Sequence, residues 1–79
     1  MDIKEALEIA KKYIENINFC EEREDSFTFG YDGDGEKNVG GLGSPCVIYK
    51  ETGEVKTFHQ YVLDHIKTGI PGIIREMDI

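Results

Sequence analysis

Carboxylates that alternate with glycines offer the oxygen ligands of a calcium site, and one segment of the chain has this pattern. Asp32-Gly33-Asp34-Gly35-Glu36 begins as an EF-hand loop does. The later positions do not fit, because Lys37 stands where the loop needs a turn glycine and Gly43 where it needs a bidentate glutamate. We therefore expect a solvated acidic loop and no metal site.

The glycines that follow offer backbone N–H groups that could donate hydrogen bonds to a phosphate. Gly40-Gly41-Leu42-Gly43-Ser44 precedes a predicted strand, whereas nucleotide-binding glycine motifs open a helix whose dipole helps to hold the anion. We interpret these glycines as positions of positive φ, or of close approach to a neighbouring strand. No cofactor is expected.

The two histidines, His59 and His65, are six residues apart, which separates them by about 120° around an α-helix. They are therefore not expected to share a metal ion. His65 falls on a predicted apolar face beside Tyr61 and Ile66, where a partly buried histidine with satisfied ring nitrogens is expected. No nucleophile elbow, zinc motif or triad order surrounds any serine or cysteine. The sequence predicts no catalytic residue, and we expect that the chain is not an enzyme.

Negative charge is concentrated in one stretch of the chain. Residues 21–36 carry seven acidic side chains and one arginine, a net charge of −6, while the whole chain carries −7. Two interpretations are open: an edge and loop kept soluble by their charge, or a docking surface for a basic partner such as a toxin nuclease, whose cleft binds phosphates. The candidate partner-binding residues are Glu21, Glu22, Glu24, Asp25, Asp32, Asp34 and Glu36.

Length and composition limit the classes of protein to consider. The chain has 79 residues, of which 39% are hydrophobic and 32% charged, and this predicts one domain over residues 1–79. Its negative charge disfavours nucleic acid and anionic membranes as partners. No apolar run approaches the ~20 residues of a membrane span, and the start lacks a signal-peptide pattern. We expect a cytoplasmic protein in which Cys20 and Cys46 are unlinked thiols.

Two helices are predicted from apolar spacing and capping residues. Between Ile3 and Ile17 apolar side chains recur at i, i+3, i+4 and i+7, which predicts a helix over residues 2–17. Asp2 is placed to cap its start. A second helix is predicted over residues 59–67, with Thr57 as its cap and Gly69 as its stop.

Between these helices the apolar period changes to two. Residues 26–31 predict a strand with one buried face. Residues 19–25 suit an exposed edge strand or an extended lead-in, and residues 32–44 predict a long loop. Residues 45–50 and 54–58 predict a hairpin. For residues 70–79, one more helical turn and a strand along the sheet are both open.

These elements predict an α+β fold. A long N-terminal helix packs on a small antiparallel sheet of three to four strands, and a short second helix follows the last hairpin, in a two-layer arrangement of the cystatin-like type. The residues predicted to share one core are Leu7, Ala10, Ile14, Ile17, Phe27, Phe29, Val47, Tyr49, Val55 and Ile66.

Residues 40–58 resemble the signature of the immunity protein 35 family, also called the YrhB-domain family. They read Gly-Gly-Leu-Gly-Ser-Pro-Cys-Val-Ile-Tyr-Lys-Glu-Thr-Gly-Glu-Val-Lys-Thr-Phe. The likeness extends in order from Ala6 in the first helix, through Phe27 and Phe29, to Ile66. Similar strand-turn-strand segments occur in other small cystatin-like domains, including secreted peptidase inhibitors. The residues after Gly69 depart from the family pattern.

The resemblance implies a binding protein without catalytic residues. The family comprises small antitoxins of bacterial toxin systems and a heat-shock-related member proposed to act as a small chaperone. We therefore expect an immunity protein that neutralises a cognate toxin by direct binding, with a small chaperone or assembly factor as the alternative. The expected partner is a toxin domain with a basic surface, and a weak homodimer is a further alternative.

Overall fold

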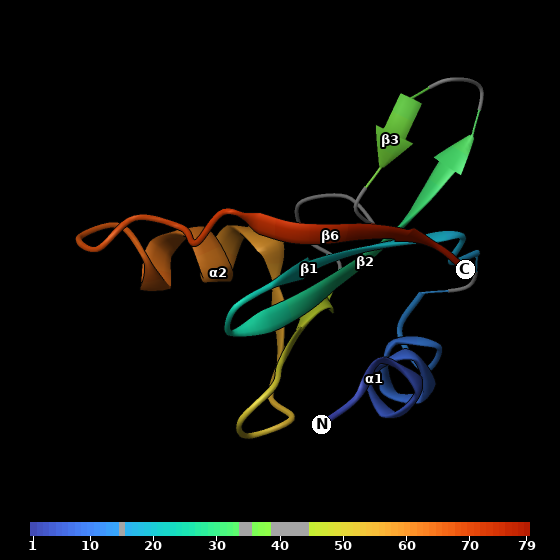
Figure 1. Cartoon of the computed structure of the whole chain (residues 1–79), viewed down its shortest axis with the longest axis horizontal. Helices are drawn as coiled ribbons and strands as arrows, with labels where there is room; N and C mark the ends of the chain where they lie inside the picture. Colours follow the sequence, from blue (N-terminus) through green and yellow to red (C-terminus); the bar gives the residue numbers. More distant parts are fainter. Residues whose placement is uncertain (15, 34–35, 39–44) are drawn as a thin grey trace.

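The computed structural model describes residues 1–14, 16–33, 36–38 and 45–79, and in them an antiparallel sheet combines with two helices. The helices are α1 (Ile3–Ala10) and α2 (Phe58–Asp64). The strands are β1 (Phe19–Arg23), β2 (Ser26–Gly33), β3 (Glu36–Asn38), β4 (Pro45–Tyr49), β5 (Val55–Thr57) and β6 (Ile73–Asp78) (Figure 1). The predicted α+β class is thus confirmed.

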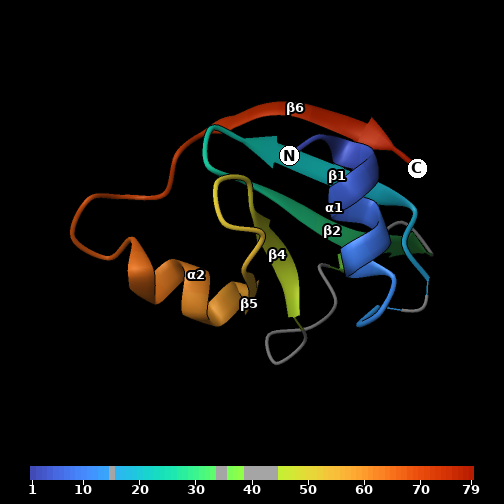
Figure 2. The same cartoon turned by 90° about the horizontal axis from the view of Figure 1, so that it is seen from below.

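The sheet is larger than predicted because the two segments whose structure the sequence leaves open, within residues 19–25 and 70–79, both contribute strands to it. Its strands follow the order β5-β4-β2-β1-β6, and β3 pairs with the far part of β2. β1 is therefore an inner strand and not an exposed edge strand or lead-in. The tail is a strand, since Cys20 of β1 pairs with Met77 of β6. Figure 2 shows β6 lying along β1 at one side of the sheet.

The N-terminal helix is short, with 8 residues. The prediction of a long helix over residues 2–17 is wrong, because the helix ends at Ala10. Its start is as predicted, because the Asp2 side chain accepts a hydrogen bond from the Glu5 amide at 2.9 Å. After Ala10 the chain tightens into turns. By Asn18 it already runs beside β2, because the Asn18 amide donates to the Gly30 carbonyl at 2.9 Å. Because the chain pairs with β2 from Asn18 onward, the helix does not continue to Ile17, although the apolar residues keep a helical spacing up to that point.

The two helices lie on different faces of the sheet. In an antiparallel pair, opposed residues point to the same side, so Ser26 and its partner Tyr49 share one face. Tyr61 of α2 packs on Tyr49, with ring centroids 5.7 Å apart, which places α2 on that face. Phe27 and Phe29 alternate with Ser26 and so point to the opposite face, where they share a buried cluster with Ala6 and Ala10 of α1. Figure 2 shows α1 crossing the sheet. The predicted two-layer arrangement therefore gains a second helical layer at the β4 end.

Most of the predicted core lies inside. The side chains of Ala10, Ile14, Phe27, Phe29 and Val47 are buried, and Leu7, Ile17, Tyr49 and Val55 are partly buried against them. The prediction that Ile66 belongs to the core is wrong, because 73% of its surface is exposed. Because α2 ends at Asp64, the helical spacing that assigned Ile66 to the apolar face does not reach it. Buried residues that the prediction missed are Ala6, Phe19, Cys20, Cys46, Ile48 and Tyr61.

The predicted long loop over residues 32–44 is wrong where the structure describes it. β2 continues to Gly33, and β3 returns beside it with Tyr31 opposite Asn38. Backbone pairing needs no apolar side chain, so a polar and glycine-rich composition does not prevent a strand. Asp34, Gly35 and the glycine-rich residues 39–44 lie outside the described residues.

Both cysteines are buried and unlinked, as predicted. Cys20 lies on β1 and Cys46 on β4, with β2 between them. Strands two places apart are separated by roughly 9–10 Å, which exceeds the ~7 Å that a disulfide spans between Cα atoms. Burial raises the pKa of the Cys20 thiol to about 12 and that of the Cys46 thiol to about 11. In the described part of the chain, no helix is long and apolar enough to cross a membrane.

The core assignment predicts a contrast between two truncations. Replacing Phe29, which is fully buried, by alanine is expected to lower the free energy of unfolding by about 3–5 kcal/mol. The control is Ile66→Ala, which removes an exposed side chain and is expected to change that energy by less than about 0.5 kcal/mol. Urea unfolding measures both, and equal losses in the two variants would refute the assignment.

The burial of the thiols predicts slow labelling. The thiolate is the reactive form, and both burial and the raised pKa values keep it scarce in the folded protein. At pH 8 we expect a thiol-reactive reagent to modify both cysteines at least tenfold faster in denaturant than in the native state. Intact-mass analysis follows the reaction. Equal rates in the two conditions would contradict the described positions of Cys20 and Cys46.

Candidate functional site

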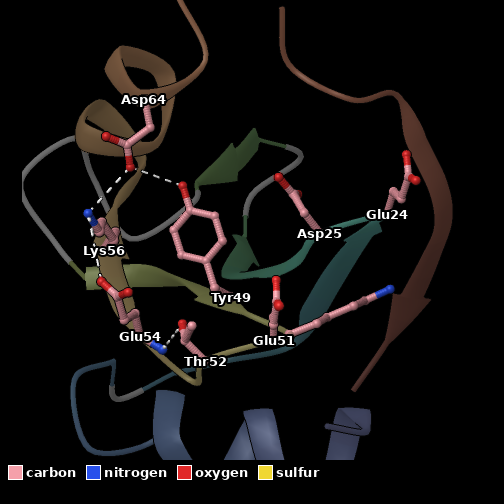
Figure 3. A pocket seen from close by; sticks show the side chains of 9 residues that line it. Glu24, Asp25, Tyr49, Glu51, Thr52, Glu54, Lys56 and Asp64 are labelled. Atoms are coloured by element: carbon pink, nitrogen blue, oxygen red, sulfur yellow. Dashed lines mark hydrogen bonds and ion pairs between the residues drawn. The ribbon is translucent and has the colours of Figure 1, made fainter. Parts of the chain in front are cut away.

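A pocket of about 460 Å³ opens where two strand turns meet the end of α2 (Figure 3). The β1–β2 turn contributes carboxylates, the β4–β5 turn contributes carboxylates and a threonine, and α2 contributes its last residue. The lining is strongly acidic, with five carboxylates against two lysines. The lining residues are Glu24, Asp25, Tyr49, Lys50, Glu51, Thr52, Glu54, Lys56 and Asp64.

The two turns meet because β2 begins where β4 ends. Ser26 is paired with Tyr49, and the Lys50 amide donates to the Asp25 carbonyl at 2.9 Å. The β4–β5 turn closes as predicted, with the Gly53 amide donating to the Tyr49 carbonyl at 2.9 Å. Gly53 has a φ of 74°, a left-handed conformation that favours glycine. This geometry places Glu51 and Glu54 at the rim (Figure 3).

One wall of the pocket is a hydrogen-bonded group around Asp64. The Tyr49 hydroxyl donates to Asp64 Oδ2 at 3.0 Å, and Nε2 of the Gln60 side chain donates to Oδ1 at 2.9 Å. Lys56 Nζ lies 3.4 Å from Oδ2. The hydrogen bond from Gln60, followed by those from Tyr49 and Lys56, lowers the pKa of Asp64. Burial and the Asp64 carboxylate raise the pKa of Tyr49. The phenol is therefore a neutral hydrogen-bond donor at physiological pH.

The inner wall is the Asp25 carboxylate, which accepts three side-chain hydrogen bonds. Tyr61 Oη donates to Oδ1 at 2.8 Å, Ser26 Oγ donates to Oδ1 at 2.9 Å, and His65 Nε2 lies 2.8 Å from Oδ2. Burial opposes ionisation of Asp25, but the hydrogen bonds from Tyr61, His65 and Ser26 outweigh it and lower its pKa. A partly buried anion is thus held by three groups from two elements.

His65 has an acceptor at each ring nitrogen. Nδ1 lies 2.8 Å from the Tyr61 carbonyl oxygen and Nε2 lies 2.8 Å from Asp25. Neither oxygen has a proton to donate, so both contacts are hydrogen bonds only when the imidazole is protonated. The bond to the Tyr61 carbonyl and the Asp25 carboxylate raise the pKa of His65, although burial opposes them. His65 is partly buried and satisfied, as predicted, and as an imidazolium it offers no lone pair to a general-base reaction.

The structure separates the predicted acidic cluster. Glu24 and Asp25 line the pocket. Glu22 instead points to the α1 face, where it binds Lys50 at 2.7 Å and Arg75 at 2.8 Å. Glu21 lies in β1 opposite Thr28 and Glu76.

The remaining predicted residues lie far from the pocket or outside the described part. Asp32 pairs with Lys37, and Glu36 with Gly33, in the β2–β3 hairpin at the other end of β2 (Figure 1). Asp34 is not among the described residues. The backbone positions of the described candidates therefore fall at both ends of β2.

Three acidic residues that the sequence analysis passed over complete the site. Glu51, Glu54 and Asp64 join Glu24 and Asp25 around one cavity. Glu51 and Glu54 lie at the two ends of the connection between the predicted hairpin strands 45–50 and 54–58. The signal that would have found them is the order of the strands: once β2 pairs antiparallel with β4, the turn before β2 and the turn after β4 must lie at the same end of the sheet.

Comparison with known proteins gives no match: no family model, no curated protein and no solved structure aligns with this chain. Within the described residues, no group of three or more histidine, cysteine, aspartate or glutamate side chains is arranged to hold a metal ion. The function is therefore argued from the pocket and its charges.

The Asp25 network predicts that this carboxylate matters more for folding than its neighbour does. Asp25→Asn removes the charge that three donors share, and we expect a loss of about 1–3 kcal/mol in the free energy of unfolding at pH 6. Glu24→Gln, at an exposed position in the same turn, is the matched control and is expected to change it by less than about 0.5 kcal/mol. Denaturant unfolding tests the pair, and an equal effect would refute the network.

Proposed function

We propose that the protein is a non-catalytic binding protein whose acidic pocket docks on a basic surface of a partner protein. The observation that carries the proposal is the pocket itself, in which carboxylates from three separate elements surround one cavity. We propose further that the partner is a toxin domain and that the protein acts as its immunity protein. The sequence resemblance supports this second step.

The rim of the pocket supports cation binding. Glu24 and Glu51 are exposed, and their side chains make no ion pair or hydrogen bond with another described residue. The Lys50 ammonium, by contrast, is engaged on the other face, where it binds Glu22 and lies 4.9 Å from the centre of the Phe27 ring. An arginine or lysine side chain that entered the pocket would meet unpaired carboxylates at the rim and the Tyr49 ring inside.

The chemistry of the pocket favours binding over catalysis. Tyr49 is a hydrogen-bond donor with a raised pKa, and both ring nitrogens of His65 have acceptors. Neither group is set to remove a proton from a substrate. Fixed negative charges beside an open cavity instead speed the encounter with a basic surface and select against acidic ones.

A second candidate function, client binding by a small chaperone, is favoured by a different observation. Large aliphatic side chains are exposed on α2, on the connection that follows it and on β6. Unfolded proteins present apolar segments, and exposed aliphatic side chains bind them without sequence specificity. The exposed aliphatic residues of this protein are Leu63, Ile66, Ile70, Ile73 and Ile74, with 46%, 73%, 40%, 42% and 63% of their surface exposed.

The immunity proposal predicts binding to the product of the open reading frame immediately upstream of the gene. We expect a 1:1 complex in titration calorimetry, with affinity that falls as salt is raised. Glu24→Lys combined with Glu51→Lys is expected to slow association at least tenfold. The control, Glu5→Lys with Glu8→Lys on the exposed side of α1, makes the same change in net charge and is expected to bind nearly as wild type does.

Two results would contradict the proposal. One is the absence of binding to that product, and the other is an equal loss of association in both charge-reversal variants. The chaperone alternative is separated by light scattering with two unrelated aggregating proteins. Suppression of both at substoichiometric amounts would favour the chaperone, whereas an immunity protein is expected to suppress neither.

A further inference from the structure

The segment that joins α2 to β6 has little to hold it by packing. Residues 66–70 are all exposed, and Pro71 is only partly buried. Gly69 has a φ of 85°, and a Cβ built on it would meet no atom within 4 Å. A segment with so few buried side chains opens at low cost unless specific bonds fasten it.

The Gly69 amide donates to the His65 carbonyl at 2.7 Å, which closes residues 65–69 into a turn. Two bonds from the β1–β2 end of the sheet then fasten the segment, one at each of its ends. At the first end, Asp25 binds His65, the residue that caps α2. At the second end, Arg23 Nε donates to the Pro71 carbonyl at 3.2 Å. Arg23 is itself buried, donates to Thr28 Oγ1 at 3.2 Å and lies over the Phe58 ring. The second fastening therefore belongs to the interior of the protein.

The first fastening depends on protonation for a stereochemical reason. A neutral imidazole has one N–H and one lone pair. If Nδ1 keeps the proton, the Nε2 lone pair faces the Asp25 carboxylate, and if Nε2 keeps it, the Nδ1 lone pair faces the Tyr61 carbonyl. Either neutral form of His65 loses one of its two hydrogen bonds. Asp25 itself stays in place, because Tyr61 and Ser26 still donate to it.

We propose that the His65–Asp25 contact is a pH-operated fastening that holds the start of residues 66–70 beside the β1–β2 turn in the protonated state and loosens it when His65 loses its proton and one of its two hydrogen bonds. Arg23 keeps the segment tethered at Pro71, so release is local and reversible. Residues 66–70 then change their mobility with pH while the sheet stays folded. The fastening needs no partner and goes beyond the proposed binding function.

The charged groups around His65 favour its protonated form. Asp25 faces it from the β1–β2 turn, and Asp64 precedes it on α2, where Gln60, Tyr49 and Lys56 also engage that carboxylate. The Tyr49 ring is stacked with the His65 ring at 6.4 Å between centroids, and the Tyr61 ring lies 4.3 Å away, tilted by 41°. Arg23, the nearest cation on β1, is directed to Pro71 and Thr28.

The pKa shifts fix the pH window. The pKa of His65 is raised above 6.5, so its stabilising contribution is fully present below about pH 6.5 and is lost as pH rises through the higher value in the folded state. The pKa of Asp25 is lowered from 3.8, so its contribution is present above about pH 3.8 and is lost as pH falls through the lower value. The fastening is complete between these limits and opens on the alkaline side.

The test is an NMR titration of the isolated protein from about pH 5 to about pH 9. The ring resonances of His65 give its midpoint, which we expect above the ordinary value of about 6.5. The methyl resonances of Ile66 and Ile70 should shift or broaden with the same midpoint, whereas the methyl resonances of the buried Ile48 should stay in place. In His65→Gln the Ile66 and Ile70 methyl resonances should keep their high-pH positions throughout.

The matched control is His59→Gln, which removes the other histidine, exposed near the start of α2, and is expected to titrate as wild type does. A His65 midpoint at or below about 6.5, or methyl resonances of Ile66 and Ile70 that do not follow it, would overturn the proposal. If His65→Gln does not fold, the wild-type titration decides by itself. Because no partner is used, a failure here is distinct from a failure of the proposed binding function.

Discussion

The Asp25 carboxylate joins the turn before β2 to the α2 layer, alongside the contact between Tyr49 and Asp64. It is partly buried in the turn before β2, and its hydrogen bonds come from Ser26 in the sheet and from Tyr61 and His65 on the α2 side. A buried anion is stable only when such donors replace the water it loses. Together with the Tyr49 contacts, these bonds hold α2 against β4, bring the last residue of α2 to the pocket and favour the protonated form of His65. The pocket and the fastened segment after α2 both follow from these contacts.

The same requirement supports the binding role that we propose for the pocket. Satisfying Asp25 and Asp64 within the fold occupies the groups best placed for proton transfer, Tyr49 and His65. What remains open to a partner is the outer charge of Glu24 and Glu51. Such exposed charges contribute little to folding and much to the rate and selectivity of association. The exposed aliphatic side chains after α2 offer a different kind of contact.

Local chemistry was readable from the sequence, and contacts between distant segments were not. Asp2 and Thr57 were assigned as helix caps because a cap depends on residues three positions away. The contact between Asp25 and His65 joins residues 40 positions apart. The end of α1 and the burial of β1 between β2 and β6 depend equally on distant partners. The acidic stretch was noticed as one cluster, but alternation along β1 sends Glu22 to one face and the turn sends Asp25 to the other.

The most direct test of this account is a double-mutant cycle on Asp25 and His65, measured by denaturant unfolding at about pH 6 and again at about pH 9. The single variants are Asp25→Asn and His65→Gln, and the cycle isolates the energy of their mutual contact. We predict a coupling of about 1–3 kcal/mol at the lower pH, within the range for groups in one hydrogen-bonded network, and a clearly smaller coupling at the higher pH, where neutral His65 keeps only one of its two hydrogen bonds. Additive losses at the lower pH, or an equal coupling at both, would contradict it.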